Sequence, residues 1–189
     1  NCVEVQRFAF KNQFSLRFCY FPLLKFVGES AFENCSSMIS FYNCKLQEVG
    51  VKSFMGCVGL QQIELVSVEV VAVQSFANCK SLSHAVLNCK VIPRECFSGC
   101  VSLQHVECES ALQIEENAFS GCDLEYLGCS RCQTSLKFSK PVLVHSDKDH
   151  QGSIKSKQLP IINRKKVIQK IEFVSGETQI LRCIREIGG

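Results

Sequence analysis

Cysteine is the residue type with the most conspicuous chemistry in this chain of 189 residues, which contains 14 of them. In a secreted protein so many cysteines would suggest a disulfide framework. Five of them recur at one position of an internal repeat, so stacked repeats would place their Cα atoms about 5 Å apart, within disulfide range. Parallel side chains, however, keep their Cβ atoms equally far apart, beyond the usual ~3.5–4.5 Å. We therefore expect unbonded thiols that act as small buried hydrophobic groups at Cys35, Cys57, Cys79, Cys100 and Cys122.

Cys129 and Cys132 form a CxxC pair, which in other proteins binds zinc or exchanges disulfides through a thiolate of lowered pKa. A structural zinc site needs a second pair of ligands, and a redox motif is expected at a helix start beside a βαβ unit, which this sequence does not offer. We interpret Cys129 as a core residue followed by an incidental cysteine, and keep a metal or redox site as an alternative. The pairing of Cys2, Cys132 and Cys183 stays open.

Two histidines, His84 and His105, occupy the same position in neighbouring repeats, and Glu64 and Glu107 lie two positions further along the strand pattern. Imidazoles about 5 Å apart beside carboxylates could hold a metal or act as an acid–base pair. No nucleophile, oxyanion loop or enclosing pocket accompanies them. We interpret these residues as the polar side of a solvated sheet and expect no catalytic residue, metal or cofactor, with a metal site on the histidine pair as the alternative.

An internal repeat positions all of these residues. Six phenylalanines follow one another at intervals of 22, 22, 22, 21 and 22, and the residue before each is small. Five residues before each Phe stands a Val or Ile, which completes one buried stripe. Two residues after it stands Asn or Gly, the types that enter the left-handed conformation at low cost, so we predict a turn with positive φ there. The phenylalanines are Phe10, Phe32, Phe54, Phe76, Phe97 and Phe119, and the turn residues are Asn12, Asn34, Gly56, Asn78, Gly99 and Gly121.

After each turn the sequence reads L-x-x-h-x-h, where h is mostly apolar, which is the period-2 pattern of a sheet with one solvated face. A unit of strand, turn and short return cannot bury its own apolar face, so neighbouring units must stack into a solenoid. We predict an α/β or mainly β repeat with one parallel sheet and short irregular or helical returns. Six strands about 4.8 Å apart would form a face roughly 24 Å across. They are predicted to begin at Leu16, Met38, Leu60, Leu82, Leu103 and Leu124.

The repeat resembles the BspA-like branch of leucine-rich repeats, whose units read approximately L-x-x-I-x-L followed by I-G-x-x-A-F-x-G/N-C. The segments VGESAFENC at 27–35 and IEENAFSGC at 114–122 match this pattern closely, and the likeness covers roughly residues 3–129. The resemblance implies a leucine-rich-repeat solenoid. It also implies a protein-binding or adhesive module, common on the surfaces of certain bacteria and of parasitic or mucosal protists.

The end of the regular repeat sets the predicted domain boundaries. Residues 1–132 form a solenoid of about six units, residues 133–166 a polar insertion or linker, and residues 167–189 a truncated restart of the array. The chain would then be a fragment of a longer array. Residues 1–132 carry 10 basic and 13 acidic side chains, a net of −3, and residues 133–189 carry 11 and 5, a net of +6. Aromatic residues are almost absent from this basic tail, so we do not expect nucleic-acid binding.

Aromatic side chains on the solvated face are the strongest candidates for partner binding. Phe18, Tyr20 and Tyr42 are predicted to cluster at its N-terminal end. Such rings are over-represented among binding hot spots because they bury a large area with little loss of entropy. The alternative is that preceding repeats, or a cap outside this chain, cover them. The candidate partner-binding residues of the sheet face are Phe18, Tyr20, Tyr42, Gln62, Glu64, His84, His105, Glu107 and Tyr126.

Six in-register units without a catalytic constellation predict a non-enzymatic binding module. We expect a protein or glycan partner, no small-molecule substrate, and a role in adhesion or host and partner interaction at the cell surface or outside the cell. The alternative is a cytoplasmic protein–protein scaffold whose many cysteines stay reduced. The chain contains no run of 18 apolar residues, so it would attach to a membrane only through an anchor outside these residues.

Overall fold

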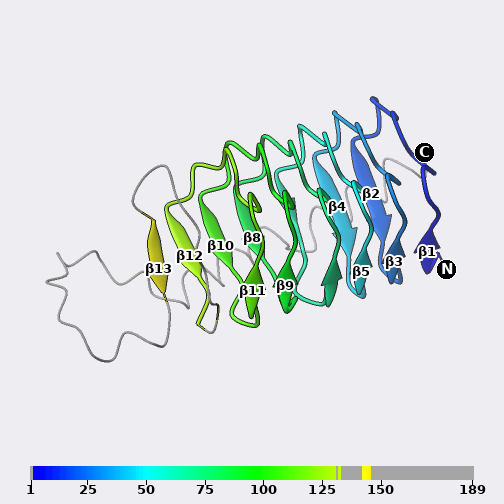
Figure 1. Ribbon diagram of the computed structural model, residues 1–189. Helices are drawn as coiled ribbons and strands as arrows, with labels where there is room; N and C mark the ends of the chain where they lie inside the picture. The colour runs from blue at the N-terminus through cyan, green and yellow to red at the C-terminus, as the bar shows by residue number, and fades with distance from the viewer. Residues whose placement is uncertain (1, 131, 133–141, 146–189) are drawn as a thin grey trace, which may run out of the picture. The chain divides into compact units, whose positions relative to one another are not determined.

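The computed structural model describes residues 2–130, 132 and 142–145, which form successive coils of a β-solenoid (Figure 1). In this part of the chain the regular secondary structure is thirteen short strands without a helix, so no described helix could cross a membrane. The strands alternate between two ladders. The first ladder contains β2 (Phe18–Phe21), β4 (Ser40–Asn43), β6 (Gln62–Ile63), β8 (His84–Val86), β10 (His105–Glu107), β12 (Tyr126–Gly128) and β13 (Leu143–His145). The second contains β1 (Glu4–Val5), β3 (Phe26–Val27), β5 (Glu48–Val49), β7 (Val70–Val71), β9 (Val91–Ile92) and β11 (Gln113–Ile114).

The predicted parallel sheet is the first ladder. Apart from β6 and β8, neighbouring strands of this ladder pair in parallel, so that Phe18 lies opposite Ser40 and His105 lies opposite both His84 and Tyr126. Each strand begins two residues later than predicted. The leucine that was expected to open the strand still belongs to the turn, where its N–H donates to the cysteine carbonyl three residues earlier, as from Leu60 to Cys57 at 3.1 Å.

The returns between the strands contain a second ladder of two-residue strands in place of the irregular or helical segments that the sequence favoured. A second left-handed residue explains the difference. Besides the predicted turns, in which Asn12, Asn34 and Asn78 have φ of 60–61° and the glycines 74–75°, each coil has positive φ two residues before its Phe. Three residues between two left-handed positions cannot form a helix. The additional positions, with φ of 50–59°, are Phe8, Ser30, Lys52, Gln74, Glu95 and Asn117.

The core is a column of phenylalanine rings, as the repeat predicted. Phe32, Phe54, Phe76 and Phe97 are fully buried. Consecutive rings from Phe10 to Phe119 stack with centroids 5.1–5.6 Å apart and interplanar angles of 5–9°. The inward residues of both ladders surround this column, so each coil closes the apolar face of the next and the coils stabilise one another.

The cysteine column runs beside the phenylalanines, and all thirteen cysteines of the described residues are free thiols, which confirms that prediction. The thiols also do something that the sequence interpretation did not include. Each Sγ–H in the column donates to the backbone carbonyl of the Phe in the preceding coil, at 3.0–3.2 Å, so these cysteines tie neighbouring coils together. Cys183 lies outside the described residues.

One coil is a residue shorter than its neighbours. Its strands β8 and β9 start seven residues apart, whereas β6 and β7, and β10 and β11, start eight apart. Both ladders divide beside this coil, because β6 and β8 belong to separate sheets and so do β7 and β9. Pro93 contributes to this division. At the equivalent position of other coils, the N–H of Ala72 or Glu115 donates to a carbonyl of the preceding coil at 2.9 Å, and proline has no N–H. We call this junction between β6/β7 and β8/β9 the seam.

The first ladder extends beyond residue 132. Strand β13 pairs in parallel with β12, from Tyr126 opposite Leu143 to Gly128 opposite His145, within the range 133–166 that the sequence assigned to an insertion or linker. The other residues of that range, and the expected restart at 167–189, lie outside the described residues. The boundaries at residues 132 and 166 therefore stay predictions.

Candidate functional site

The outward side of the first ladder carries every residue that the sequence singled out for binding. From β2 to β10 of this ladder buried residues alternate with exposed or partly exposed ones, as in β2, where Cys19 is 8% exposed between Phe18 at 56% and Tyr20 at 58%. The strands therefore present one solvated surface, which we call the wet face. Its outward residues in chain order are Phe18, Tyr20, Ser40, Tyr42, Gln62, Glu64, His84, Val86, His105, Glu107 and Tyr126.

The N-terminal part of the wet face is aromatic. Tyr20 and Tyr42 stack with ring centroids 5.0 Å apart and nearly parallel planes, because they lie opposite one another in β2 and β4. Phe18 stands two residues before Tyr20, and the Arg17 guanidinium lies 5.7 Å from the centre of its ring. The structure thus brings the three predicted rings together on one exposed surface.

Tyr42 carries a polar group into this aromatic patch. The Cys44 thiol donates to the Tyr42 hydroxyl at 3.2 Å. Side-chain hydrogen bonding with Cys44, in which the protonated phenol can also donate to the sulfur, followed by burial and by the charges of neighbouring groups, raises the pKa of Tyr42 to about 12. The hydroxyl is therefore neutral at physiological pH and is available to donate a hydrogen bond to a partner.

The C-terminal part of the wet face is a row of imidazoles ending in a tyrosine. His84 and His105 stack at 5.1 Å with an interplanar angle of 11°, and Tyr126 follows at 6.2 Å from His105. Nδ1 of His84 lies 3.0 Å from the Ser83 hydroxyl. Burial, and secondarily the charge of His105, lower the pKa of His84, while Glu107 opposes this shift. Neutral rings are therefore the main form of His84 at neutral pH.

One nitrogen in this row is unsatisfied. Nδ1 of His105 is buried and has no hydrogen-bond partner among the described residues. Gln62, Glu64 and Glu107 are exposed around the two imidazoles. The described part of the chain contains no group of three or more His, Cys, Asp or Glu side chains arranged to hold a metal ion. What this arrangement offers is a strip of flat rings with hydrogen-bonding groups along its edge.

The CxxC pair has the opposite electrostatics to a redox motif. Burial, followed by the neighbouring Cys132, raises the pKa of Cys129 to about 11. Burial also raises the pKa of Cys132. Thiol exchange needs a thiolate, whose formation is favoured by a lowered pKa. Cys129 instead packs in the core, as the sequence interpretation held.

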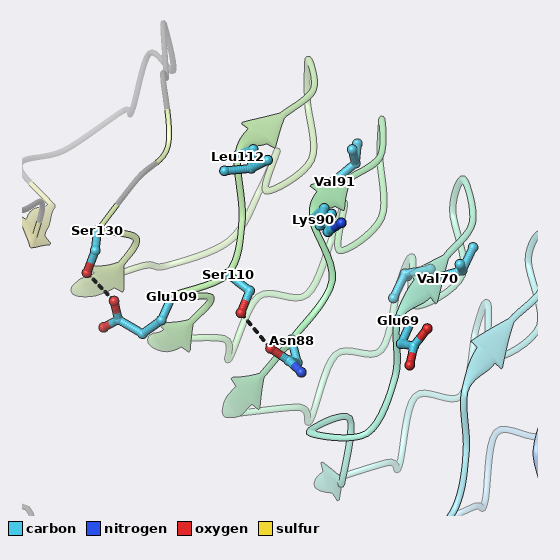
Figure 2. Close-up of a pocket in the computed structure, with 10 residues that line it drawn as sticks. Glu69, Val70, Asn88, Lys90, Val91, Glu109, Ser110, Leu112 and Ser130 are labelled. Carbon is cyan, nitrogen blue, oxygen red and sulfur yellow. Dashed lines mark hydrogen bonds between the residues drawn. The ribbon is translucent and has the colours of Figure 1, made fainter.

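Sequence reasoning missed a groove beside the seam. This groove of about 1010 Å³ is lined by residues of the corners between the two ladders (Figure 2). Its lining includes Asn88 and Ser110, whose hydroxyl donates to the Asn88 amide oxygen at 2.5 Å, and Ser130, whose hydroxyl donates to Glu109. The interval of 21 between Phe76 and Phe97 was the sequence signal for this groove, because it marks the shortened coil.

The fold and the repeated core define a leucine-rich-repeat solenoid. A family model described as the BspA type leucine rich repeat region matches residues 3–126 in six copies, so the chain belongs to that family. This confirms the resemblance that the repeat showed. Leucine-rich repeats typically bind proteins and are generally non-enzymatic.

Two solved structures share the fold. A leucine rich cell surface protein from Faecalibacterium prausnitzii A2-165 is 24% identical, with a TM-score of 0.65 over 80% of this chain and 45% of that protein. A leucine-rich repeat protein from Bacteroides ovatus ATCC 8483 is 28% identical, with a TM-score of 0.59 over 67% of this chain and 34% of that protein. The chain thus spans less than half the length of these structures. No curated protein matches the sequence.

Proposed function

We propose that this chain is a non-enzymatic recognition module that binds a protein partner through the wet face. The observation that carries the proposal is the exposed aromatic patch, in which Phe18 and Tyr20 are more than half exposed and Tyr20 stacks on Tyr42. A monomeric protein gains nothing from exposing such rings side by side, whereas a partner that covers them buries a large apolar area.

The geometry of the wet face suits a protein surface. The rings are held by strands on a rigid core, so little conformational entropy is lost when they are covered. From β2 to β12 the face spans five strand spacings, roughly 24 Å, which is enough for a helix or a loop of a partner. The aromatic end would act as the binding hot spot, and the imidazoles of His84 and His105 and the carboxylates of Glu64 and Glu107 would contribute specificity.

We place this module at the cell surface, in adhesion or host interaction. The support is its family and the description of its Faecalibacterium neighbour as a cell surface protein. The thiol column is compatible with an oxidising environment, because burial restricts the access of oxidants and, by raising the pKa of Cys35, Cys57, Cys79 and Cys122, disfavours the reactive thiolate there. The alternative is a cytoplasmic scaffold. Counting free thiols in protein that has been kept under oxidising conditions separates the two, since reactive or disulfide-shuffled cysteines there would favour the cytoplasm.

A glycan is the second candidate partner. Exposed tyrosines offer an apolar face and a polar tip, and the amide of Gln62 lies in the next strand with the carboxylate of Glu64 beside it. A sugar ring could stack on Tyr20 or Tyr42 while its hydroxyls bond to these groups.

The test uses the labelled full chain on a protein array and on a glycan array in parallel. A variant with Phe18→Ala, Tyr20→Ala, Tyr42→Ala and His84→Ala should keep its circular dichroism spectrum and lose binding to the protein spots. The matched control replaces exposed residues away from the wet face, Val58→Ala and Val101→Ala. Unchanged binding by the wet-face variant would move the site elsewhere, and signals confined to the glycan array would favour the second candidate.

A further inference from the structure

The groove at the seam is a consequence of the shortened coil. Each corner joins a first-ladder strand to the following second-ladder strand, and β8 and β9 start seven residues apart, one fewer than the pairs of strands on either side. A shorter corner between two longer ones is recessed, and the lining residues belong to this corner and to the corners around it (Figure 2). A solenoid with equal coils would have no such recess.

The groove has an apolar wall and a polar wall. The apolar wall is aliphatic: Val70 is 53% exposed, Val91 39% and Leu112 52%, and these residues come from three successive coils. The polar wall consists of Asn88, Glu109, Ser110 and Ser130, of which Ser110 and Ser130 donate to Asn88 and Glu109. The groove therefore runs along the solenoid axis with side chains of different character on its two sides.

The charges along the groove favour a cation. Glu69 and Glu109 contribute two carboxylates and Lys90 one ammonium group, so the lining carries an excess of one negative charge. Glu69 and Lys90 are exposed, and Glu109 is half-buried. A basic side chain that pairs with a carboxylate at the rim of an apolar surface gains both charge complementarity and burial of its methylene groups.

We propose that this groove binds a short extended peptide segment of a protein, in which aliphatic and basic side chains alternate. The lining residues come from four coils, and three strand spacings of about 4.8 Å give roughly 14 Å, the length of four or five extended residues. In an extended peptide, alternate side chains point to opposite sides. Aliphatic residues therefore face Val70, Val91 and Leu112, while Lys or Arg faces Glu69 or Glu109.

A peptide fits this groove better than a sugar. The apolar wall is branched aliphatic, and the described lining contains no aromatic ring on which a sugar could stack. Branched aliphatic side chains gain most from contact with other aliphatic groups, by burial of about 25 cal/mol per Å². The groove also shares no residue with the wet face, so this site is independent of the proposed function.

The experiment selects a phage-displayed library of short random peptides on the full chain. Enriched peptides should combine aliphatic with basic residues, and Val70→Lys should weaken their binding at least tenfold, measured by fluorescence anisotropy of the labelled peptides. The matched control is Val101→Lys, because Val101 is 52% exposed and lies outside the groove. Glu69→Gln with Glu109→Gln should reduce affinity severalfold and flatten its salt dependence, whereas Glu116→Gln, at an exposed residue outside the groove, should not.

Several results would overturn the proposal. They are the absence of any enriched peptide, enrichment of acidic peptides, and equal loss of binding in Val70→Lys and Val101→Lys. Oligosaccharide binding on a glycan array that Val70→Lys abolishes would replace the peptide by a glycan. The wet-face variant, with Phe18, Tyr20, Tyr42 and His84 changed to Ala, should bind the enriched peptides normally. Loss of peptide binding in that variant would assign the peptides to the wet face. That result would contradict the groove proposal without contradicting the proposed function of the wet face.

Discussion

The inward and outward sides of the same coils differ in how their residues vary. Inside, Phe32, Phe54, Phe76 and Phe97 place the same ring at the same position, fully buried and stacked on its neighbours. Outside, the residue that starts each first-ladder strand from β2 to β12 changes from Phe through Ser and Gln to His, His and Tyr. Repetition inside lets every coil close the next one, and variation outside gives each part of the wet face its own chemistry. Stability is thus distributed over the array, whereas recognition is local.

Phe76→Ala tests the inward side most severely. Phe76 is fully buried and stacks on a ring at 5.4 Å on one side and at 5.3 Å on the other. We expect a loss of about 3–5 kcal/mol in the free energy of unfolding, as for other large core deletions. The measurement is urea unfolding followed by circular dichroism. Phe10→Ala is the matched control, because Phe10 is only partly buried at the end of the column; equal losses would contradict a stacked core.

Alkaline pH should destabilise the inward side by a similar amount. Burial is the largest cause that raises the pKa of Cys57, Cys79 and Cys96, all fully buried, above the ordinary value of 9.0. A thiol whose pKa is raised in the folded state stabilises the fold fully below that ordinary value, and this contribution is lost as pH rises above it. Each thiol lowers the free energy of unfolding by up to about 1.4 kcal/mol per pH unit above its ordinary pKa. One pH unit above that value, the three thiols together account for up to about 4 kcal/mol.

The measurement is the urea midpoint as a function of pH. It should be nearly constant at neutral pH and fall above the ordinary thiol pKa, and Cys79→Ala should remove part of the slope. A midpoint that stays constant through that window would show that the column thiols ionise freely in the folded chain.

The turns separate two smaller effects. Gly99 and Gly121 both have φ of 75°, but an added Cβ at Gly99 would collide with Oδ1 of Asn78, whereas at Gly121 the nearest atoms lie at 3.6 Å. Gly121→Ala should therefore lower the free energy of unfolding only by the cost of a left-handed alanine, about 1–2 kcal/mol. Gly99→Ala should lower it further. Combining Gly99→Ala with Asn78→Ala should recover the excess. Identical losses in the two single variants would show that the Asn78 contact adjusts freely.

The sequence predicted the inward side well and the outward side only in part. Period and residue type together indicated the Phe column, the thiol column and the turns at Asn12 and its equivalents, because these positions repeat. The left-handed residues before each Phe gave no such signal, since Phe8, Ser30 and Lys52 share a conformation without sharing a type. Backbone hydrogen bonds to the neighbouring coil hold that conformation, as in the hydrogen bond of 2.8 Å that the Ser30 N–H donates to the Val51 carbonyl.

On the outward side, the period-2 pattern placed the candidate residues on one face, but the pattern contains no information on which rings stack. That depends on register, which joins Tyr20 to Tyr42 and His84 to His105. The groove was not predicted because it depends on a deviation from the repeat. One missing residue and the absent N–H of Pro93 interrupt each ladder at the seam. Neither feature belongs to the repeat pattern.

His84→Ala is the gentlest test of the contrast. His84 is exposed, so at neutral pH its removal should change the free energy of unfolding by no more than about 0.5 kcal/mol. Burial and the nearby His105 lower its pKa from 6.5. A histidine whose pKa is lowered by folding stabilises the fold above its ordinary pKa, and that contribution is lost as pH falls through the lowered value. The variant should therefore unfold with a weaker dependence on acid than the wild type, while Glu107, which favours the charged imidazole, limits the difference. A loss at neutral pH as large as that of Phe76→Ala would mean that the wet face also stabilises the solenoid, and the division between repeated core and variable surface would fail.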